Sequence, residues 1–181
     1  GNVGRKTLEV LERKGLPIDD LYLVASSKSA GKKIHFQGKD IVVSELENFN
    51  FSKVKIAFFA AGGKISEKFA EKAAKHCLVI DNSSFFRMDP DVPLIVPQVN
   101  SNALNDIKKN IIANPNCSTA QLVIALKPLH DLFVIKRVVV STYQSVSGAG
   151  KAAMDELIKQ TKLTLDGKDI KPENFTKQIA F

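Results

Sequence analysis

Ile56-Ala57-Phe58-Phe59-Ala60-Ala61-Gly62-Gly63 is a continuous apolar run that ends in a pair of glycines. Such a run is typical of a central parallel strand that is covered on both faces. A helix is expected to begin at Ser66 and to run to about residue 75, because its apolar residues recur on one face: Phe69, Ala70, Ala73 and Ala74. Leu78-Val79-Ile80 then supplies a second buried strand. A strand, a helix and a strand in this order predict one unit of a doubly wound parallel sheet.

The alternation of helices and strands continues on both sides of this unit. Upstream, the sequence predicts a helix that ends at Lys14, a strand over Leu21–Ala25, and a hairpin around Gly38 made of Lys33–Phe36 and Asp40–Val43. Downstream, it predicts a strand at Ile111–Ala113, a buried helix from Cys117 to about Asp131, a long strand over Val134–Tyr143 and a helix over Lys151–Lys162. The expected fold class is α/β, with a doubly wound, Rossmann-like parallel sheet.

Ligands bind to such a sheet at the carboxyl ends of its strands. Gly62-Gly63 and the residues from Asn82 to Arg87 each follow a predicted strand, so we expect both at the functional edge. Arg87, which comes after two phenylalanines, could grip a phosphate or a carboxylate with its planar guanidinium. A structural ion pair is the competing interpretation of this arginine.

Two loops are candidates for nucleotide binding. Gly1-Asn2-Val3-Gly4 has the form of the second half of a glycine-rich phosphate loop, and the chain opens on it without a methionine, which suggests a fragment that lacks the preceding strand. Ser26 to Lys32 follows the next predicted strand, where the ribose of a dinucleotide is bound. Lys28 among serines suits a 2′-phosphate, so NADP is preferred to NAD, and a polar turn that happens to contain lysines is the alternative.

Asn114-Pro115-Asn116-Cys117-Ser118-Thr119 places a single cysteine in the first turn of a predicted helix. Asn116 is a favourable N-cap residue, and the unpaired amides and the dipole of a helix N-terminus favour negative charge. We therefore expect the thiol of Cys117 to ionise more easily than a free thiol, and the thiolate is the nucleophilic form. The competing interpretation is a small buried hydrophobic residue, which is the role expected for Cys77.

Gln144 ends the strand predicted downstream and opens the loop from Ser145 to Gly150. Its amide could donate a hydrogen bond to a carbonyl oxygen that becomes negative, or it could simply be a polar residue at a strand end. His35, His76 and His130 show no paired spacing, so no metal site is predicted.

The composition narrows the class of partner. The 181 residues have a formal net charge of +7, but the basic residues, mostly lysines, are scattered among acidic ones, which favours a lysine-rich surface over a nucleic-acid partner. No apolar run approaches the length of a membrane span, so no membrane partner is expected. The two cysteines form neither a disulfide framework nor a zinc motif, which suits a reducing cytoplasm.

Five of these stretches together resemble aspartate-semialdehyde dehydrogenases, in the order of that family: Gly1–Gly4, Ser26–Lys32, Phe85–Arg87, Asn114–Thr119 and Gln144–Gly150. The cysteine and glutamine motifs are specific, whereas the glycine loop is not. The resemblance covers essentially the whole chain, which would correspond to about the first half of a family member. It implies an NADP-binding domain at residues 1–113 without its first strand, the start of an α+β catalytic and dimerisation domain at residues 114–181, and a homodimer.

The resemblance also implies a reaction. Cys117 would attack the carbonyl carbon of L-aspartyl 4-phosphate, phosphate would leave, and NADPH would reduce the thioester to L-aspartate 4-semialdehyde, a step in the biosynthesis of lysine through diaminopimelate, of threonine and of methionine. Arg87 would hold the phosphate, Gln144 would bind the substrate near the reacting carbon, and Asn116 would help to position the site. The implied cofactor contacts lie in three loops: Gly1, Asn2, Val3, Gly4, Lys28, Ser29, Ser147 and Gly148.

The sequence departs from the family pattern in two ways. Gln98 stands where the family has an acidic residue after the proline of Val96-Pro97. The family's general-base histidine, substrate arginine and second phosphate-contacting lysine would lie beyond Phe181, so the chain as given is expected to turn over poorly or not at all. The competing functions are an N-acetyl-γ-glutamyl-phosphate reductase, disfavoured by the residues that flank Cys117, a non-catalytic nucleotide-binding module in which Cys117 is buried and, more weakly, a cysteine hydrolase.

Overall fold

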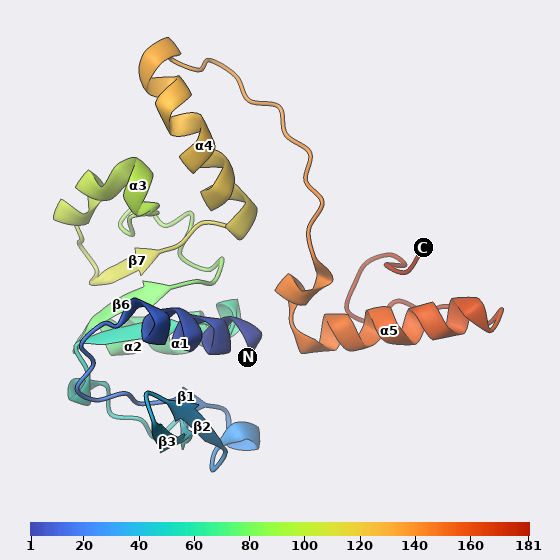
Figure 1. Ribbon diagram of the computed structural model, residues 1–181, viewed down its shortest axis with the longest axis horizontal. Helices are drawn as coiled ribbons and strands as arrows, with labels where there is room; N and C mark the ends of the chain where they lie inside the picture. The colour runs from blue at the N-terminus through green and yellow to red at the C-terminus, as the bar shows by residue number, and fades with distance from the viewer. The chain divides into compact units, whose positions relative to one another are not determined.

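The computed structural model describes residues 1–181, which divide into two compact units. The larger unit spans Val3–Lys136, and the smaller unit contains Gly1–Asn2 and Arg137–Phe181. Figure 1 shows the helices and strands, coloured along the chain from blue to red. All seven strands belong to the larger unit. No helix combines the length and the apolar character that crossing a membrane requires.

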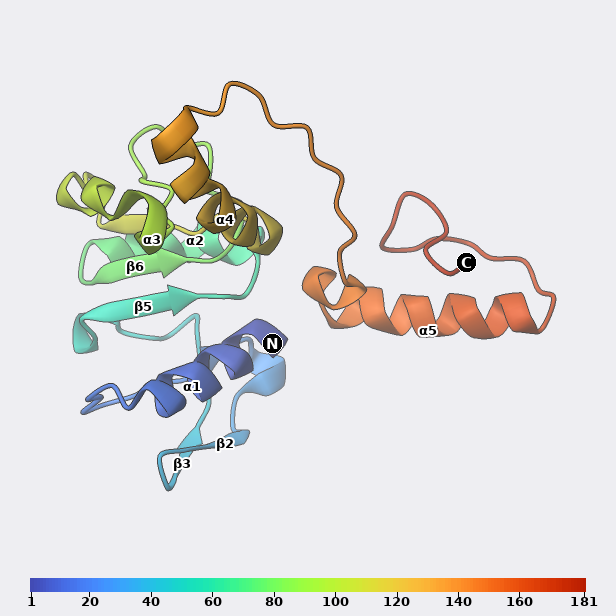
Figure 2. The ribbon, with the colours of Figure 1, turned by 45° about the horizontal axis from the view of Figure 1, so that its top comes forward.

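Three parallel strands form the main sheet of the larger unit (Figure 2). They are β5 (Ile56–Phe59), β6 (Leu78–Asp81) and β7 (Ile111–Ala113), with β6 between the other two. Helix α2 (Gly63–Ala74) connects β5 to β6 and packs against the sheet. The predicted parallel unit of strand, helix and strand is therefore confirmed.

The position of β5 differs from its prediction. β5 pairs with β6 alone, and Ile56 and Phe58, which share one face, are 50% and 51% exposed. The prediction of a central strand covered on both faces is therefore wrong. A run of apolar side chains favours a buried strand, but it does not determine which other strands pair with it.

The core of the larger unit lies between α2 and the sheet. The predicted inner face of α2 is buried there together with residues of β6 and β7, such as Val79 and Ile111. The helix begins at Gly63, earlier than predicted. The backbone of its N-cap residue Gly62 has a φ of +94°, which residues other than glycine rarely adopt. Ser66 therefore lies inside the helix and is buried, so the prediction that the helix begins at Ser66 is wrong.

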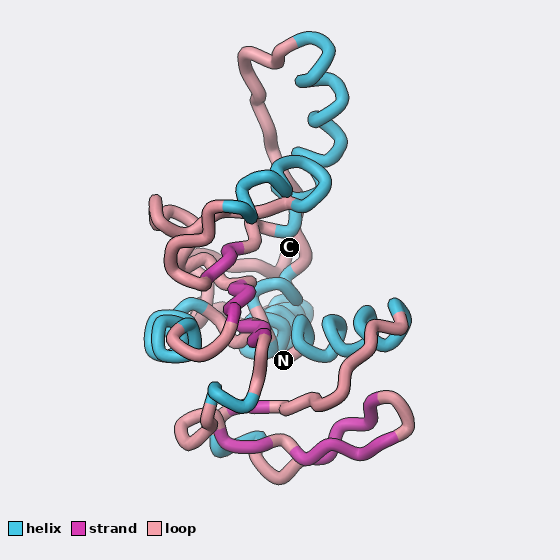
Figure 3. The backbone as a smooth tube through the Cα atoms, turned by 90° about the vertical axis from the view of Figure 1, so that its left-hand side faces the viewer, coloured by secondary structure: helices cyan, strands magenta, loops and turns pink.

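Two small sheets precede the main one. β1 (Val24–Ala25) pairs in parallel with β4 (Ser44–Glu45), whereas β2 (Lys33–Phe36) and β3 (Lys39–Val42) form the predicted antiparallel hairpin, drawn in magenta at the bottom of Figure 3. The strand predicted over Leu21–Ala25 is shorter than expected, because its partner β4 has two residues. Helix α1 (Asn2–Lys14) ends before Gly15, as predicted.

Helix α4 (Cys117–Phe133) follows β7 and confirms the predicted strand and helix around the cysteine motif. No residue of α4 is buried, and Leu132 and Phe133 are largely exposed. The prediction of a buried helix is therefore wrong in this chain, because helical spacing identifies an apolar face but not what covers it. The short helix α3 (Pro97–Asn100) contacts α4.

Residues 134–145 contain neither helix nor strand, so the long strand predicted over Val134–Tyr143 is wrong (Figure 1). Val139 in this stretch is 79% exposed. A run of β-branched residues favours a strand only where a neighbouring strand provides backbone partners. No strand pairs with these residues.

The smaller unit is built on α5 (Lys151–Leu165), which confirms the helix predicted there. Two buried side chains of α5 hold the segment that follows it. The Glu156 carboxylate accepts hydrogen bonds from the backbone N–H groups of Glu173 (2.8 Å) and Asn174 (2.6 Å), and Gln160 Oε1 accepts one from the N–H of Ile179 (2.8 Å). The pKa of Glu156 lies below its usual value, because these backbone donors, that of Glu173 foremost, stabilise the carboxylate.

Candidate active site

Three predicted loops meet at one edge of the main sheet. Gly62-Gly63 follows β5, the segment from Asn82 to Arg87 follows β6, and the segment from Asn114 to Cys117 follows β7. The parallel register pairs Phe59 with Asp81 and Asp81 with Ala113, so the three carboxyl ends are adjacent. The prediction that Gly62-Gly63 and the segment from Asn82 to Arg87 lie at the same edge of the sheet is confirmed, and the segment from Asn114 to Cys117 lies at that edge too.

Cys117 is the first residue of α4 and is exposed, which excludes the interpretation of this cysteine as a buried hydrophobic residue. Asn116 is the N-cap, as predicted: its side-chain oxygen accepts a hydrogen bond from the backbone N–H of Ser118 at 2.9 Å. Cys117 Sγ lies 3.9 Å from the same Asn116 oxygen. The sulfur is therefore accessible at a helix N-terminus, where backbone amides favour a negative charge.

Cys77 takes the other role that the sequence predicts for a cysteine. It is buried, and its thiol donates to the backbone carbonyl of Ala73 at 3.3 Å. Burial raises the pKa of the Cys77 thiol. A buried thiol of this kind is inert, so Cys117 is the reactive candidate.

Arg87 is held by backbone carbonyls of two loops. Its Nε donates to Asn114 O at 2.9 Å, and its Nη2 lies 3.5 Å from Asn82 O. Arg87 forms no ion pair in residues 1–181, so the ion-pair interpretation of this residue is wrong. Two of the five N–H donors of the guanidinium are used in this way. Phe85 and Phe86 pack edge to face against each other.

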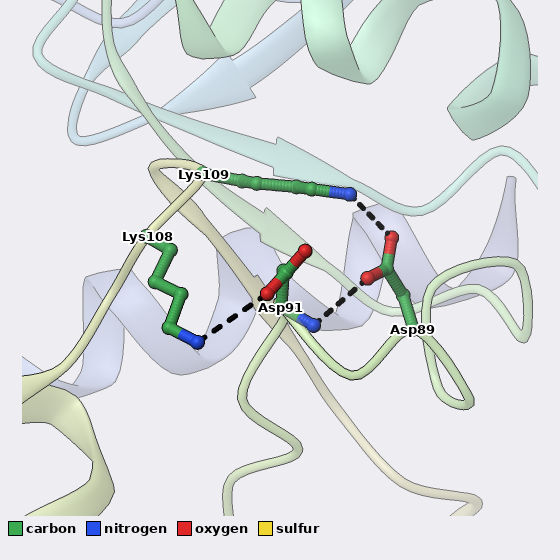
Figure 4. Close-up of polar contacts among 4 residues, drawn as sticks. All are labelled: Asp89, Asp91, Lys108 and Lys109. Carbon is green, nitrogen blue, oxygen red and sulfur yellow. Dashed lines mark hydrogen bonds and ion pairs between the residues drawn. The ribbon is translucent and has the colours of Figure 1, made fainter.

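Two ion pairs join the segment after Arg87 to the segment before β7 (Figure 4). Lys109 Nζ lies 2.9 Å from Asp89 Oδ2, and Lys108 Nζ lies 3.3 Å from Asp91 Oδ1. The hydrogen bond from Lys109 lowers the pKa of Asp89, and the same contact raises the pKa of Lys109. The chain that carries Arg87 is thereby fixed beside the strand that leads to Cys117.

The candidate cofactor residues lie in three places. Lys28 is exposed and Ser29 is half-buried in the short helical turn Ser27–Ser29, which follows β1 after the N-cap residue Ser26. Asn2, Val3 and Gly4 form the first turn of α1, and Gly1 precedes it. In the smaller unit, Ser147 and Gly148 are exposed in the turn Val146–Ala149, where Ser147 Oγ lies 2.8 Å from Ser145 Oγ.

Gln144 lies just before Ser145, the N-cap residue of this turn, and is exposed. Its side-chain amide donates to Thr142 Oγ1 at 3.1 Å. Gln144, Ser147 and Gly148 belong to the smaller unit, whereas Arg87, Asn116 and Cys117 belong to the larger one. Within the larger unit, the loop that carries Arg87 and the loop that carries Cys117 are joined by the hydrogen bond from Arg87 Nε to Asn114 O.

One group of buried polar residues beside this edge was not predicted from the sequence. Asp81, Ser66 and Ser83 are buried, and both serine hydroxyls donate hydrogen bonds to the Asp81 carboxylate. The available signal was an aspartate at the end of an apolar strand, followed by small polar residues. A buried carboxylate at such a place requires several hydrogen-bond donors around it.

Comparison with known proteins identifies the family. The family model for the NAD binding domain of semialdehyde dehydrogenase matches residues 1–107, and the model for the semialdehyde dehydrogenase dimerisation domain matches residues 126–181. This chain belongs to the semialdehyde dehydrogenase family. Membership confirms the predicted Rossmann-like fold class followed by the start of a dimerisation domain.

Curated relatives in this family are named aspartate-semialdehyde dehydrogenase. Those of Aquifex aeolicus and Rickettsia bellii are 54% and 52% identical to the chain over 185 and 183 residues. Each alignment covers 100% of this chain and 54% of the relative, so the chain spans about half the length of the curated relatives it matches. The resemblance stated from the sequence motifs is confirmed.

Solved structures agree with this assignment. The crystal structure of aspartate semialdehyde dehydrogenase II from Vibrio cholerae has a TM-score of 0.92 at 51% identity and covers 100% of this chain and 55% of that one. The same enzyme "complexed with ASA" has a TM-score of 0.91 at 50% identity, covering 98% of this chain and 54% of that one. The structure from Candida albicans "with NADP" has a TM-score of 0.60 at 30% identity and covers 75% of this chain and 45% of that one.

Proposed function

We propose that this chain is the NADP-binding and cysteine-bearing part of an aspartate-semialdehyde dehydrogenase. The observation that supports this most strongly is the exposed Cys117 at the N-terminus of α4, on the same sheet edge as Arg87, in a member of the semialdehyde dehydrogenase family. The reaction is the reductive dephosphorylation of L-aspartyl 4-phosphate to L-aspartate 4-semialdehyde. The cofactor-binding domain is proposed to cover residues 1–113, and the catalytic and dimerisation domain to begin at residue 114.

The chemistry begins at the sulfur of Cys117. The thiolate attacks the acyl carbon of the substrate, so that a carbon–sulfur bond forms, the bond to the phosphate oxygen breaks, and inorganic phosphate leaves. The amides of the first turn of α4, which Asn116 caps, favour the negative sulfur. Arg87 holds the phosphate, and Gln144 holds the substrate near the reacting carbon. Forming a thioester divides a difficult reduction into two easier steps.

The donor set of the chain fits a phosphorylated dinucleotide. Lys28 is exposed and forms no ion pair in residues 1–181, so its ammonium is available to a 2′-phosphate, and Ser29 adds a hydroxyl beside it. No atom lies within 4 Å of a Cβ built on Gly1, Gly4 or Gly148, which leaves these backbones open to close approach. The residues that would hold NADP are Gly1, Asn2, Val3, Gly4, Lys28, Ser29, Ser147 and Gly148.

When bound, NADPH would supply the hydride that the thioester carbon requires. The sulfur of Cys117 then departs as the thiolate, and the semialdehyde is released. This activity belongs to the biosynthesis of lysine through diaminopimelate, of threonine and of methionine. We further propose that the protein acts as a cytoplasmic homodimer, which the match to a dimerisation-domain model supports.

The first half-reaction tests the function on the chain itself. The chain is mixed with L-aspartyl 4-phosphate, and the mass of the Cys117 peptide is measured together with the released phosphate. We expect one aspartyl group on Cys117 and none in a Cys117→Ser variant. N-acetyl-γ-glutamyl phosphate, offered at the same concentration, should acylate Cys117 much more slowly. No aspartyl adduct, or faster acylation by the glutamyl compound, contradicts the proposal.

Complete turnover is expected to be absent or very slow in the chain as given. The measurement is NADPH formation from L-aspartate 4-semialdehyde, NADP and inorganic phosphate, followed by absorbance. Phosphate-dependent turnover at a rate typical of enzymes, about 1 per second or more, contradicts this expectation.

A further inference from the structure

We propose that Asp81 is a positioning residue of this site. Through hydrogen bonds, Asp81 orients Arg87 and the turn that carries Cys117. The roles of Arg87 and Cys117 rest on the proposed function. Asp81 is the last residue of β6, is 0% exposed and forms no ion pair in residues 1–181. A carboxylate buried without a cation is costly, so its hydrogen bonds decide whether the surrounding loops hold their shape.

The carboxylate of Asp81 is surrounded by donors from two elements. Its Oδ1 accepts from Ser66 Oγ at 2.6 Å and from the backbone N–H of Ser83 at 3.1 Å, and its Oδ2 accepts from Ser83 Oγ at 2.7 Å. Ser83 Oγ in turn accepts from the backbone N–H of Phe85 at 3.1 Å. Ser66 connects Asp81 to helix α2, whereas Ser83 folds the loop after β6 around the carboxylate.

The backbone of Asp81 reaches the cysteine loop. Its carbonyl oxygen accepts from the N–H of Asn114 at 2.8 Å, and the carbonyl of Asn114 accepts from Arg87 Nε at 2.9 Å. The side-chain amide of Asn114 donates to Asn82 Oδ1 at 3.3 Å, and Arg87 Nη2 lies 3.5 Å from Asn82 O. The two loops are thus joined in a ring of hydrogen bonds that has Asp81 at its buried end. Cys117 follows three residues after Asn114.

A purely structural role predicts a different pattern of effects from a positioning role. If Asp81 only stabilises the fold, the loss of either serine partner should act alike. If Asp81 positions the loops, Ser83 should matter for the site and Ser66 should matter for stability only, because Ser66 lies in α2 and Ser83 in the loop that leads to Arg87. The two serines are therefore a matched pair of test positions.

The test measures how the site distinguishes an anionic from a neutral reagent. The full chain is alkylated with iodoacetate or iodoacetamide, and the two rates at Cys117 are measured by peptide mass spectrometry, which separates Cys117 from the buried Cys77. A positioned Arg87 favours the anionic reagent, so the rate ratio should fall about three- to tenfold in Arg87→Ala. No change of the ratio in Arg87→Ala overturns the proposal.

The same ratio is then compared in Asp81→Asn, Ser83→Ala and Ser66→Ala, each checked for folding by circular dichroism. We expect Asp81→Asn and Ser83→Ala to lower the ratio about as much as Arg87→Ala, and Ser66→Ala to lower the melting temperature while keeping the ratio within twofold of the wild type. Ser83→Ala provides the test where Asp81→Asn does not fold. An unchanged ratio in Ser83→Ala, or an equal fall in Ser66→Ala, overturns the proposal.

This outcome is independent of the proposed function. The rate ratio reports the position of Arg87 relative to Cys117 and requires neither aspartyl phosphate nor NADP. If aspartyl phosphate fails to acylate Cys117 while the serine variants behave as expected, the proposed function fails and the positioning role stands. If acylation occurs but substitution of Asp81 or Ser83 leaves the rate ratio unchanged, the proposed function stands and the positioning role fails.

Discussion

Asn116 and Cys117 show how the local sequence determines the environment of a single sulfur. The side-chain oxygen of Asn116 caps α4 through the N–H of Ser118 and also lies 3.9 Å from Cys117 Sγ. Asn116 therefore affects both the stability of α4 and the polar surroundings of the Cys117 sulfur. Substitutions at position 116 can distinguish these effects.

We predict that Asn116→Ala lowers the free energy of unfolding by about 1 kcal/mol, because α4 loses its cap. Asn116→Asp should keep most of that stability, since aspartate is an equally good cap, but it should slow alkylation of Cys117 at pH 7 several-fold, because a carboxylate beside the sulfur disfavours the thiolate. Urea unfolding and iodoacetamide labelling measure the two effects. Labelling of Asn116→Asp as fast as that of the wild type would show that the thiol does not sense this charge.

At the scale of single residues, the sequence predicted what depends on near neighbours. The N-cap at Asn116 and the buried Cys77 follow from flanking residues, whereas the flanking residues of Cys117 left a buried position open and the structure shows it exposed. Asp81 and Ser66 were missed because they are 15 positions apart and meet only when α2 packs on the sheet. The carbonyl partners of Arg87 were missed for the same reason, since one lies 27 positions away.

Among the elements, the connection between the Arg87 segment and the start of β7 gives a pH-dependent prediction. Replacing Lys109 by methionine removes the ion pair with Asp89 but keeps the length of the side chain. We expect the melting temperature of Lys109→Met to fall more than that of the control Lys108→Met, whose partner Asp91 is more exposed and lies farther away, at 3.3 Å. Equal effects of the two substitutions would contradict this prediction.

The pH range of that difference follows from the two pKa shifts. The pKa of Asp89 is lowered in the folded state, so its contribution is complete above the unfolded value of about 3.9 and is lost as the pH falls through the folded value. The pKa of Lys109 is raised, so its contribution is complete below about 10.4 and is lost as the pH rises through the folded value. The difference in melting temperature should be constant between these values and shrink outside them.

The elements were predicted where periodicity and capping agree. α2, α4, α5, β6 and β7 were all expected, because each combines a clear apolar pattern with a turn or cap signal. The strand over Val134–Tyr143 failed because its only support was a β-branched composition, and the central position of β5 failed because pairing is decided by distant segments. The sequence pattern of a segment thus indicates which secondary structure it favours, whereas the segments that pair or pack with it decide which one it forms.

At the scale of the whole molecule, the stability effects of substituting one buried and one exposed phenylalanine test the position of the core. Phe86 is 2% exposed and belongs to the core cluster, whereas Phe133 is 75% exposed at the end of α4. We predict that Phe86→Ala lowers the free energy of unfolding by about 3–5 kcal/mol, because it leaves a cavity. Phe133→Ala should change it by less than about 0.5 kcal/mol. Urea unfolding followed by circular dichroism compares the two, and a comparable loss in Phe133→Ala would place this side chain in a packed environment.

The boundary between the two units should be the preferred site of proteolysis. Residues 134–145 contain no helix or strand, and Lys136 and Arg137 are trypsin sites next to exposed valines. Brief digestion should cut there first and leave a product that spans Gly1–Lys136, or Gly1–Arg137, which intact-mass measurement detects. The control is Lys72 in α2, whose helical backbone should resist cleavage. Earlier cleavage at Lys72 would contradict the assignment of the core.

The fastening of the C-terminal segment to α5 by side chains also makes that segment a sensor of the helix. The amide hydrogens of Glu173, Asn174 and Ile179 have Glu156 or Gln160 as their acceptors. Glu156 and Gln160 lie in the second and third turns of α5. These amide hydrogens exchange with solvent deuterium when the two side chains release them, so their exchange rates report the opening of a helix to which they do not belong. Deuterium uptake at these three positions of an irregular segment would thus report the opening of helix α5.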